Sequence, residues 1–352
     1  MPATTYRNRR AVAIENGDVR VTVTVEGGHV AEILHKRSGV NPLWTPPWPT
    51  IEPSTYSLAK HPEYGADSES KLLAGIMGHN LCIDLFGNPS EEEAAAGMTV
   101  HGESSVAPYK IESSAAELTA RAELPQAQLR VERKIALGDS VEFTETVENT
   151  SACDRPIAWT QHVTLGPPFL VKGSTQFRAS ATKSKVLEPD FTEGKGYMQT
   201  GALFDWPNVP RLDGGTTDLR VLYPDAVSAG FTSHLMDPAR ADAFFTAWSP
   251  DSQVAFGYVW RRADFPWLGI WEETYARLTP PWGGVTLTRG MEFGASPIPE
   301  TRRRMIDRGT LFGERCYRWI PAGGRVTVRY AAFIRTASAV PEDPSEYVRL
   351  PE

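Results

Sequence analysis

The segment LRVERKIALGDSVEFTETV, residues 129–147, decides the fold class. Within it, residues 129–137 and residues 141–147 each alternate between apolar and polar side chains. Alternation at period two is typical of a strand with one face against a core and the other in solvent. The intervening residues 138–140, Gly-Asp-Ser, favour a tight turn. The segment therefore predicts an antiparallel β-hairpin.

More strands are expected on both sides of this hairpin. Residues 19–25 alternate in the same way, Gly27-Gly28 turns the chain, and residues 29–34 form the returning strand. Helical periodicity is limited to residues 91–96. Further strand-like runs, separated by turn residues, are 118–124, 158–165, 254–260, 284–288 and 326–334. These patterns predict an all-β, antiparallel architecture.

Length and composition allow one large domain. The chain has 352 residues, 41% of them hydrophobic, which is enough to bury a sizeable core. No internal repeat at a fixed period is visible, and we expect a single domain over residues 1–352. Residues 41–72 and 198–224 are rich in proline and lack periodicity. Such long loops either cover a functional site or simply connect elements at the surface.

Charge and targeting signals narrow the partners. The 36 Lys and Arg residues are outnumbered by 43 Asp and Glu residues, so we expect no nucleic-acid partner. No apolar run approaches the ~18 residues of a membrane helix, and none follows Arg9-Arg10 as in a signal peptide. We therefore expect a cytoplasmic protein without membrane contact. Cys82, Cys153 and Cys316 are odd in number and widely spaced, which predicts reduced thiols.

Several motifs are missing from the sequence. It contains no GxxxxGK[ST] phosphate loop, no GxGxxG dinucleotide motif, no HExxH zinc motif and no GxSxG nucleophile elbow. Instead, His79-Asn80, His101, His162 and Glu292 stand in unusual surroundings. Glu292 lies between apolar neighbours and glycines, where partial desolvation raises the pKa of a carboxyl group toward that of a general base. The alternative for Glu292 is an ordinary ion pair with Arg289.

Five short segments, in order, resemble the aldose 1-epimerase, or galactose mutarotase-like, family. They are Asn41-Pro-Leu-Trp44, residues 78–87 (GHNLCIDLFG), His101-Gly-Glu103, residues 147–162 with Glu-Asn-Thr-Ser before Trp-Thr-Gln-His162, and residues 290–294 (GMEFG). The resemblance covers roughly residues 20 to 335. It implies a large antiparallel β-sandwich, the mutarotase supersandwich, with a sugar cleft on a concave face.

The resemblance also implies a mechanism. An isomerase of this kind interconverts the α and β anomers of an aldose by opening the sugar ring. Glu292 would be the base at O1 and His162 the acid at the ring oxygen, while His101 binds near that oxygen. We expect His162 and Glu292 to flank the sugar, with room for a pyranose ring between them. No metal or organic cofactor is expected.

Substrate recognition departs from the family pattern. The family has an arginine where this chain has His79 and Asn80, and its hydroxyl-binding aspartate has no clear counterpart here. We take His79 and Asn80 as substrate-binding candidates, although a buried hydrogen-bonding role is the alternative for His79. Trp271 and Glu273 could stack on the sugar and bind its hydroxyls. A core position is the alternative for Trp271, as for Trp267.

Other functions remain open at this point. A hexose-6-phosphate mutarotase would need basic residues at the cleft rim, for which Arg261, Arg262 and Arg277 are candidates. A non-catalytic carbohydrate-binding protein, a lyase or a glycosidase could use the same fold. The three candidate histidines could instead bind a metal together with Glu292. The expected partner in the leading hypothesis is a free or terminal aldose, bound by a monomer or a homodimer.

Overall fold

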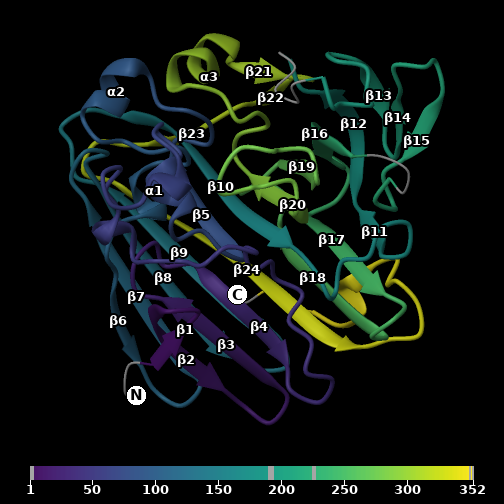
Figure 1. Ribbon diagram of the computed structural model, residues 1–352, viewed down its shortest axis with the longest axis horizontal. Coiled ribbons are helices and arrows are strands. Elements are labelled where there is room, and N and C mark those ends of the chain that lie inside the picture. Colours follow the sequence, from purple (N-terminus) through teal and green to yellow (C-terminus); the bar gives the residue numbers. More distant parts are fainter. Residues whose placement is uncertain (1–3, 189–193, 224–226, 349, 351–352) are drawn as a thin grey trace.

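Two large antiparallel β-sheets make up most of the molecule (Figure 1). The computed structural model describes residues 4–188, 194–223, 227–348 and 350. The larger sheet has twelve strands. In spatial order they are β1 Thr4–Tyr6, β2 Arg9–Glu15, β3 Val19–Thr24, β4 Val30–His35, β5 His79–Asp84, β10 Arg155–Leu165, β20 Leu287–Gly294, β19 Trp267–Thr274, β16 Ser228–Met236, β12 Ala181–Val186 and β13 Leu203–Asp205, with β23 Arg318–Ile320 paired to β10.

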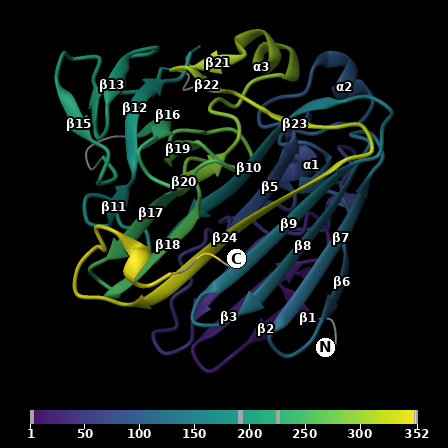
Figure 2. The same ribbon diagram turned by 180° about the vertical axis from the view of Figure 1, so that it is seen from behind.

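The second sheet has eight strands. In Figure 2 its middle strands lie side by side in front of the larger sheet. In spatial order the strands are β11 Gln176–Ala179, β17 Asp242–Ser249, β18 Val254–Arg261, β24 Arg325–Thr336, β9 Val141–Asn149, β8 Leu129–Leu137, β7 Glu117–Leu124 and β6 Lys110–Ser113. The predicted hairpin is confirmed, because β8 pairs with β9 from Leu137↔Val141 to Leu129↔Asn149.

The remaining elements are short. Two small hairpins pair β14 Asn208–Pro210 with β15 Thr216–Asp218, and β21 Thr310–Leu311 with β22 Glu314–Arg315. The helices are α1 Ser70–Leu73, α2 Glu91–Ala95 and α3 Arg302–Arg308, with 3-10 turns η1 Pro53–Thr55, η2 Pro62–Tyr64, η3 Glu103–Ser105 and η4 Pro344–Glu346. Each described helix is too short to cross a lipid bilayer.

Helix α2 was predicted, and its start has a clear cause. The hydroxyl of Ser90 accepts a hydrogen bond from the backbone N–H of Glu93, and the Glu93 carboxylate accepts one from the backbone N–H of Ser90. This capping box satisfies two N–H groups that a helix start otherwise leaves unpaired. Helices α1 and α3 were not predicted from the sequence.

The facing sides of the two sheets share one apolar core. Alternate residues of β8 and β9 point into it, as do alternate residues of β10 and β20 from the larger sheet. Trp159, Met291 and Phe293 of the larger sheet meet Phe143 and Tyr330 of the smaller one in this cluster. The predicted all-β antiparallel sandwich is confirmed. All three cysteines are free, as expected.

One predicted strand was placed wrongly. The sequence predicts a strand at residues 284–288, but residues 281–285 form turns and β20 begins at Leu287. Every residue of β20 is buried, so exposure to solvent does not alternate along the strand. Arg289 and Gly290 also interrupt the alternation of apolar and polar side chains that located β8 and β9.

The two long irregular stretches have different locations. Residues 41–72 include η1, η2 and most of α1, and they contribute to the cavity described below. Of residues 198–224, all but Pro224, which lies outside the described residues, are placed, and they include β13, β14 and β15. None of the described residues of this second stretch lines the cavity.

Candidate active site

Neighbouring strands of the larger sheet bring the candidate residues together. His162 on β10 is the register partner of Glu292 on β20 and of Asn80 on β5. Directly paired residues of adjacent strands project from the same face of a sheet. This is the face turned away from the shared core, since the residues on either side of His162 and Glu292, such as Val163 and Met291, point into that core.

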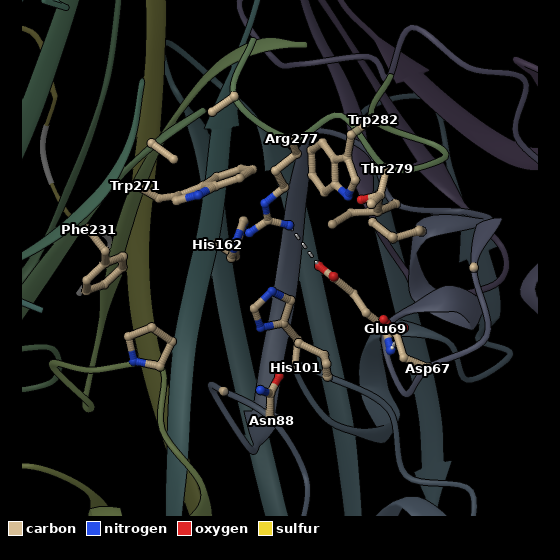
Figure 3. Close-up of a pocket in the computed structure, with 18 of the residues that line it drawn as sticks. Asp67, Glu69, Asn88, His101, His162, Phe231, Trp271, Arg277, Thr279 and Trp282 are labelled. Carbon is tan, nitrogen blue, oxygen red and sulfur yellow. Dashed lines mark hydrogen bonds and ion pairs between the residues drawn. The ribbon is translucent and has the colours of Figure 1, made fainter. Parts of the chain in front are cut away.

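A cavity of about 400 Å³ opens on this face (Figure 3). Its size is typical of a small-molecule site. His101, His162 and Glu292 all line it, so three residues far apart in the sequence converge there. Further lining residues come from the 41–72 stretch, from β16, from β19 and from the segment after β19. They include Trp44, Asp67, Glu69, Phe231, Trp271, Arg277 and Trp282.

His162 and Glu292 are in direct contact. The distance from His162 Nε2 to Glu292 Oε1 is 3.1 Å, and the two residues are 4% and 2% exposed. The expectation that a pyranose ring would fit between them is therefore wrong. Because β10 and β20 are adjacent strands in register, their paired side chains cannot be a sugar ring apart.

The cavity perturbs both ionisable groups in opposite directions. Desolvation by burial holds the pKa of His162 well below its usual value, and the neighbouring His101 adds to that effect. Burial also holds the pKa of Glu292 well above its usual value. His162 Nδ1 lies 2.9 Å from the Thr164 hydroxyl, which fixes the ring plane. Perturbed groups in a cavity, with a fixed mutual geometry, are typical of acid–base sites.

Glycine at position 290 makes room for the carboxylate. A Cβ atom built on Gly290 would lie 2.3 Å from Glu292 Oε1, closer than nonbonded atoms approach. The Glu292 side chain therefore lies over Gly290 of strand β20, where no side chain is present. Gly269, the register partner of Glu292 on β19, is also close to the Glu292 side chain and to the Phe231 ring.

His101 lies next to His162, with ring centroids 4.7 Å apart. Its φ of 67° is in the left-handed region, and Gly102 follows with φ 81°. Its Nδ1 lies 2.7 Å from the carbonyl oxygen of Phe86. A carbonyl oxygen can only accept, so Nδ1 carries the proton and Nε2 of the neutral ring is an acceptor. Burial lowers the pKa of His101 to about 4.

We expect His101 to make stability depend on pH. The unfolded chain protonates this histidine below pH ~6.5, whereas the folded protein leaves it neutral down to about 4. The neutral His101 ring therefore makes its full contribution to the free energy of unfolding above pH ~6.5. This contribution is lost as the pH falls toward 4. When the pH is lowered from 7 to 5, the unfolding free energy should fall in both proteins. The fall should be about 2 kcal/mol smaller in His101→Gln than in the parent. Urea unfolding at both pH values measures this, and an equal loss in both proteins would contradict it.

His79 and Asn80 have different surroundings. The His79 ring points into the shared core, where it contacts the Tyr258 hydroxyl at 3.0 Å and Gln161 Oε1 at 2.8 Å. This is the buried hydrogen-bonding role considered as its alternative. Asn80 projects on the same face as His162, but it is fully buried and does not line the cavity. Within the described part of the chain, neither amide atom of Asn80 has a hydrogen-bond partner.

Aromatic rings form one wall of the cavity. The Trp271 ring lies 6.0 Å from the His162 ring and 6.0 Å from the Trp282 ring. Trp282 in turn stacks on Trp44 at 6.3 Å. Trp267, by contrast, is fully buried and donates to the Arg315 carbonyl, as a core residue does. Trp271 is thus the predicted aromatic residue that faces the cavity.

Glu273 is buried at the end of β19 and does not line the cavity. Its Oε1 accepts hydrogen bonds from the backbone N–H groups of Ala276 and Arg277 at 2.7 and 3.0 Å. Its Oε2 lies 3.5 Å from Arg277 Nε. Glu273 therefore holds the following turn and the base of the Arg277 side chain.

Arg277 and Glu69 meet at the cavity wall, with His101 and His162 drawn close to them (Figure 3). Arg277 Nη1 lies 3.6 Å from Glu69 Oε1, and its guanidinium carbon lies 4.6 Å from the centre of the Trp282 ring. Desolvation raises the pKa of Glu69, and Arg277 opposes this shift.

Two alternatives for these residues lose support. Arg289 lies 3.5 Å from Glu272 and donates to the Leu219 carbonyl, so its ion pair is with Glu272 and not with Glu292. Over the described ranges, no three His, Cys, Asp or Glu side chains are grouped in a way that could hold a metal ion.

Comparison with solved structures identifies the architecture. A candidate aldose 1-epimerase from Klebsiella pneumoniae is 13% identical, with a TM-score of 0.67 over 94% of this chain and 80% of the other. A galactose mutarotase-like protein from Lactobacillus casei is also 13% identical, with a TM-score of 0.59 over 92% of this chain and 100% of the other. The fold is galactose mutarotase-like. A similar protein from Clostridium acetobutylicum has a TM-score of 0.58 at 13% identity, over 95% of this chain and 98% of the other.

The mutarotase-like fold was thus correctly inferred from the short segments. No family model matches the sequence, and no curated protein does either. At this level of identity, the similarity establishes the fold and leaves the chemistry to be argued from the site.

Sequence reasoning missed several residues that line the cavity of this mutarotase-like fold. They are Asp67, Glu69, Asn88, Phe231 and Trp282. Glu69 belongs to the irregular 41–72 stretch, whose length was the only available signal. Arg277 had been considered only as a phosphate ligand. Such residues meet through folding of distant loops, which leaves no local pattern.

Proposed function

We propose that this protein is an aldose 1-epimerase, interconverting the α and β anomers of a sugar by acid–base ring opening. The observation that carries the proposal is the contact between His162 and Glu292, 3.1 Å apart in a cavity with an aromatic wall. The fold of the solved relatives supports it. The ligand would be a small sugar, since cavities of this kind combine an apolar wall with a few polar anchors.

Contact between acid and base suits this reaction. O1 and the ring oxygen of a pyranose are both bonded to C1, so two adjacent side chains can reach them together. Glu292 takes the proton from the O1 hydroxyl, and His162 gives a proton to the ring oxygen as the C1–O5 bond breaks. The product is the open-chain aldehyde. Rotation about C1–C2 and reversal of both transfers closes the ring as the other anomer.

The proton inventory is consistent with these roles. The pKa directions favour a protonated carboxyl group on Glu292 and a neutral imidazole on His162. The Glu292 carboxyl group thus carries the one proton that the pair can exchange. Movement of this proton to His162, whose Nε2 lies 3.1 Å from Glu292 Oε1 without hydrogen-bond geometry, would give a carboxylate and an imidazolium, the base and the acid that ring opening requires. The neutral and the charged forms of the pair therefore differ only in where one proton lies.

The charges around the cavity favour a neutral sugar over a sugar phosphate. Of the three arginines suggested for a phosphate, only Arg277 lines the cavity, and Glu69 and Glu273 lie beside it. Arg262 pairs with Glu314 at 2.6 Å. Asp67 and Glu69 add acidic groups to the same wall. A phosphate dianion there would face at least as many carboxylates as cations.

Mutarotation of freshly dissolved sugars tests the proposal. Purified protein should accelerate the change in optical rotation of α-glucose, α-galactose or another aldose in a panel, above the spontaneous rate in the same buffer. Proton NMR of the anomeric signals provides an independent measurement. Sugar binding detected by tryptophan fluorescence without any acceleration would overturn the enzymatic proposal and would instead indicate a carbohydrate-binding protein. A new reducing end or an unsaturated product would indicate a glycosidase or a lyase.

A further inference from the structure

The ion pair between Arg277 and Glu69, two residues that line the cavity, is longer than a charge-assisted hydrogen bond. Its closest distance is 3.6 Å, and Arg277 also lies 3.5 Å from Glu273. Charge-assisted hydrogen bonds usually measure about 2.7–2.9 Å. The pair between Arg302 and Glu93, for example, has such a distance, 2.9 Å. Arg277 is thus placed between two carboxylates without a short bond to either.

The Arg277 guanidinium nevertheless has a fixed place. It lies over the Trp282 ring at 4.6 Å and over the Trp271 ring at 5.7 Å. The backbone N–H of Arg277 is bonded to Glu273, which fixes the start of the side chain. Stacking on two indole rings and anchoring at the backbone hold its donor groups toward the cavity. Arg277 is therefore preorganised while retaining capacity to donate hydrogen bonds.

Trp271 connects this pair to the acid–base pair. Its ring lies 6.0 Å from the His162 ring on one side and 5.7 Å from the Arg277 guanidinium on the other. Figure 3 shows Arg277 and Glu69 facing each other, with His162 and His101 beside them in the view. A pyranose lying along this wall with C1 at His162 and Glu292 would present its far end, C3 and C4, to Arg277 and Glu69.

A vicinal diol matches the chemistry of the Arg277–Glu69 pair. A guanidinium group offers only donors, an ionised carboxylate only acceptors, and each sugar hydroxyl can do both. Two adjacent hydroxyls can therefore accept from Arg277 and donate to Glu69 at once. A phosphate or carboxylate on the ligand would satisfy Arg277 but would repel Glu69. The pair discriminates by charge as well as by shape.

We propose that Arg277 and Glu69 determine substrate specificity by binding the O3 and O4 hydroxyls of a neutral aldopyranose. The inference rests on the proposed epimerase function of the same cavity. The sequence has no arginine near His79 and Asn80 that could bind the sugar hydroxyls. Arg277 and Glu69 would take that role. Neither residue takes part in proton transfer, so both are binding residues.

The test compares Arg277→Met and Glu69→Gln with the parent protein, using the best aldose and its 3-deoxy and 4-deoxy analogues. Methionine keeps much of the stem and removes the donors and the charge. We expect Arg277→Met to raise KM about 10-fold to 100-fold, as for loss of charged hydrogen bonds, with kcat changed much less. The analogues should bind the parent more weakly than the full sugar, and this difference should shrink in both variants.

Arg262→Met is the matched control, because Arg262 forms an ion pair with Glu314 outside the cavity lining. It should leave KM unchanged. An unchanged KM in Arg277→Met would overturn the inference, as would a 6-phosphate of the sugar competing more strongly than the sugar itself. Tryptophan quenching measures binding separately from turnover. If the parent binds the aldose without anomerising it, the epimerase proposal fails, while the same deoxy-sugar comparison still decides the role of Arg277 and Glu69.

Discussion

Replacing Glu292 with glutamine is expected to lower kcat for anomer interconversion by about 10²-fold to 10⁴-fold, the usual contribution of a general base. The amide has nearly the shape of the carboxyl group, but it cannot take the proton from O1. Sugar binding, measured by quenching of tryptophan fluorescence, should remain within a few fold of the parent. Polarimetry with the two purified proteins measures the difference in rate.

The stability of this variant provides a second measurement. Burial raises the pKa of Glu292, so the folded protein pays a free-energy penalty whenever this carboxyl group is ionised. The neutral glutamine avoids that penalty, and we expect the unfolding free energy at pH 8 to be unchanged or higher. Glu123→Gln, at a 72% exposed carboxylate on β7, is the control and should change neither rate nor binding. Full activity in Glu292→Gln would show that Glu292 is not the base.

Arg133→Met is expected to destabilise the protein by about 3–5 kcal/mol, the cost of leaving one partner of a buried ion pair alone. Arg133 is 2% exposed, and its Nε lies 2.5 Å from Glu145 Oε1. Its other nitrogens donate to the Gly28 carbonyl and to Gln161. Removing the guanidinium would leave the Glu145 carboxylate buried without its cation. Urea unfolding at pH 7 measures the loss.

Arg130→Met is a matched control on the same strand. Arg130 is 52% exposed and its ion pair with Glu123 is on the solvent side, so we expect little or no change in the unfolding free energy. Equal effects of the two substitutions would contradict the structural role of the buried pair. Gln161 contacts both Arg133 and His79 and is adjacent to His162 in β10. Arg133→Met should therefore also lower activity in the fraction that remains folded.

The sequence located strands with one solvent-exposed face, and also the largely buried strands β10 and β18. In β8 and β9, buried residues alternate with more exposed ones along the whole hairpin, and both were placed to within two residues. In β5, β16 and β20 every residue is buried, because loops and helices cover the outer face of the larger sheet. Burial of both faces weakens the period-two signal, and β5 and β16 were not recognised.

Some site residues could be recognised from short sequence segments, whereas others meet only after folding. His101, His162 and Glu292 stand in short segments with a recognisable order, and the cavity brings all three together. Their contact geometry was predicted wrongly, since adjacency of β10 and β20 cannot be read from sequence order. Glu69 and Arg277 come from two irregular segments whose meeting depends on the packing of the whole sheet.

At Gly290, protein stability and the proposed catalytic activity favour different residues. Glycine inside a strand costs roughly 0.5–1 kcal/mol relative to alanine, and β20 carries one in its middle. Any larger residue at this position would displace the carboxyl group of Glu292 from its resting place. Selection for thermal resistance alone would favour a residue with a Cβ atom at this position, whereas selection for the proposed activity would keep glycine. In a library screened separately for both properties, position 290 should divide the survivors most clearly.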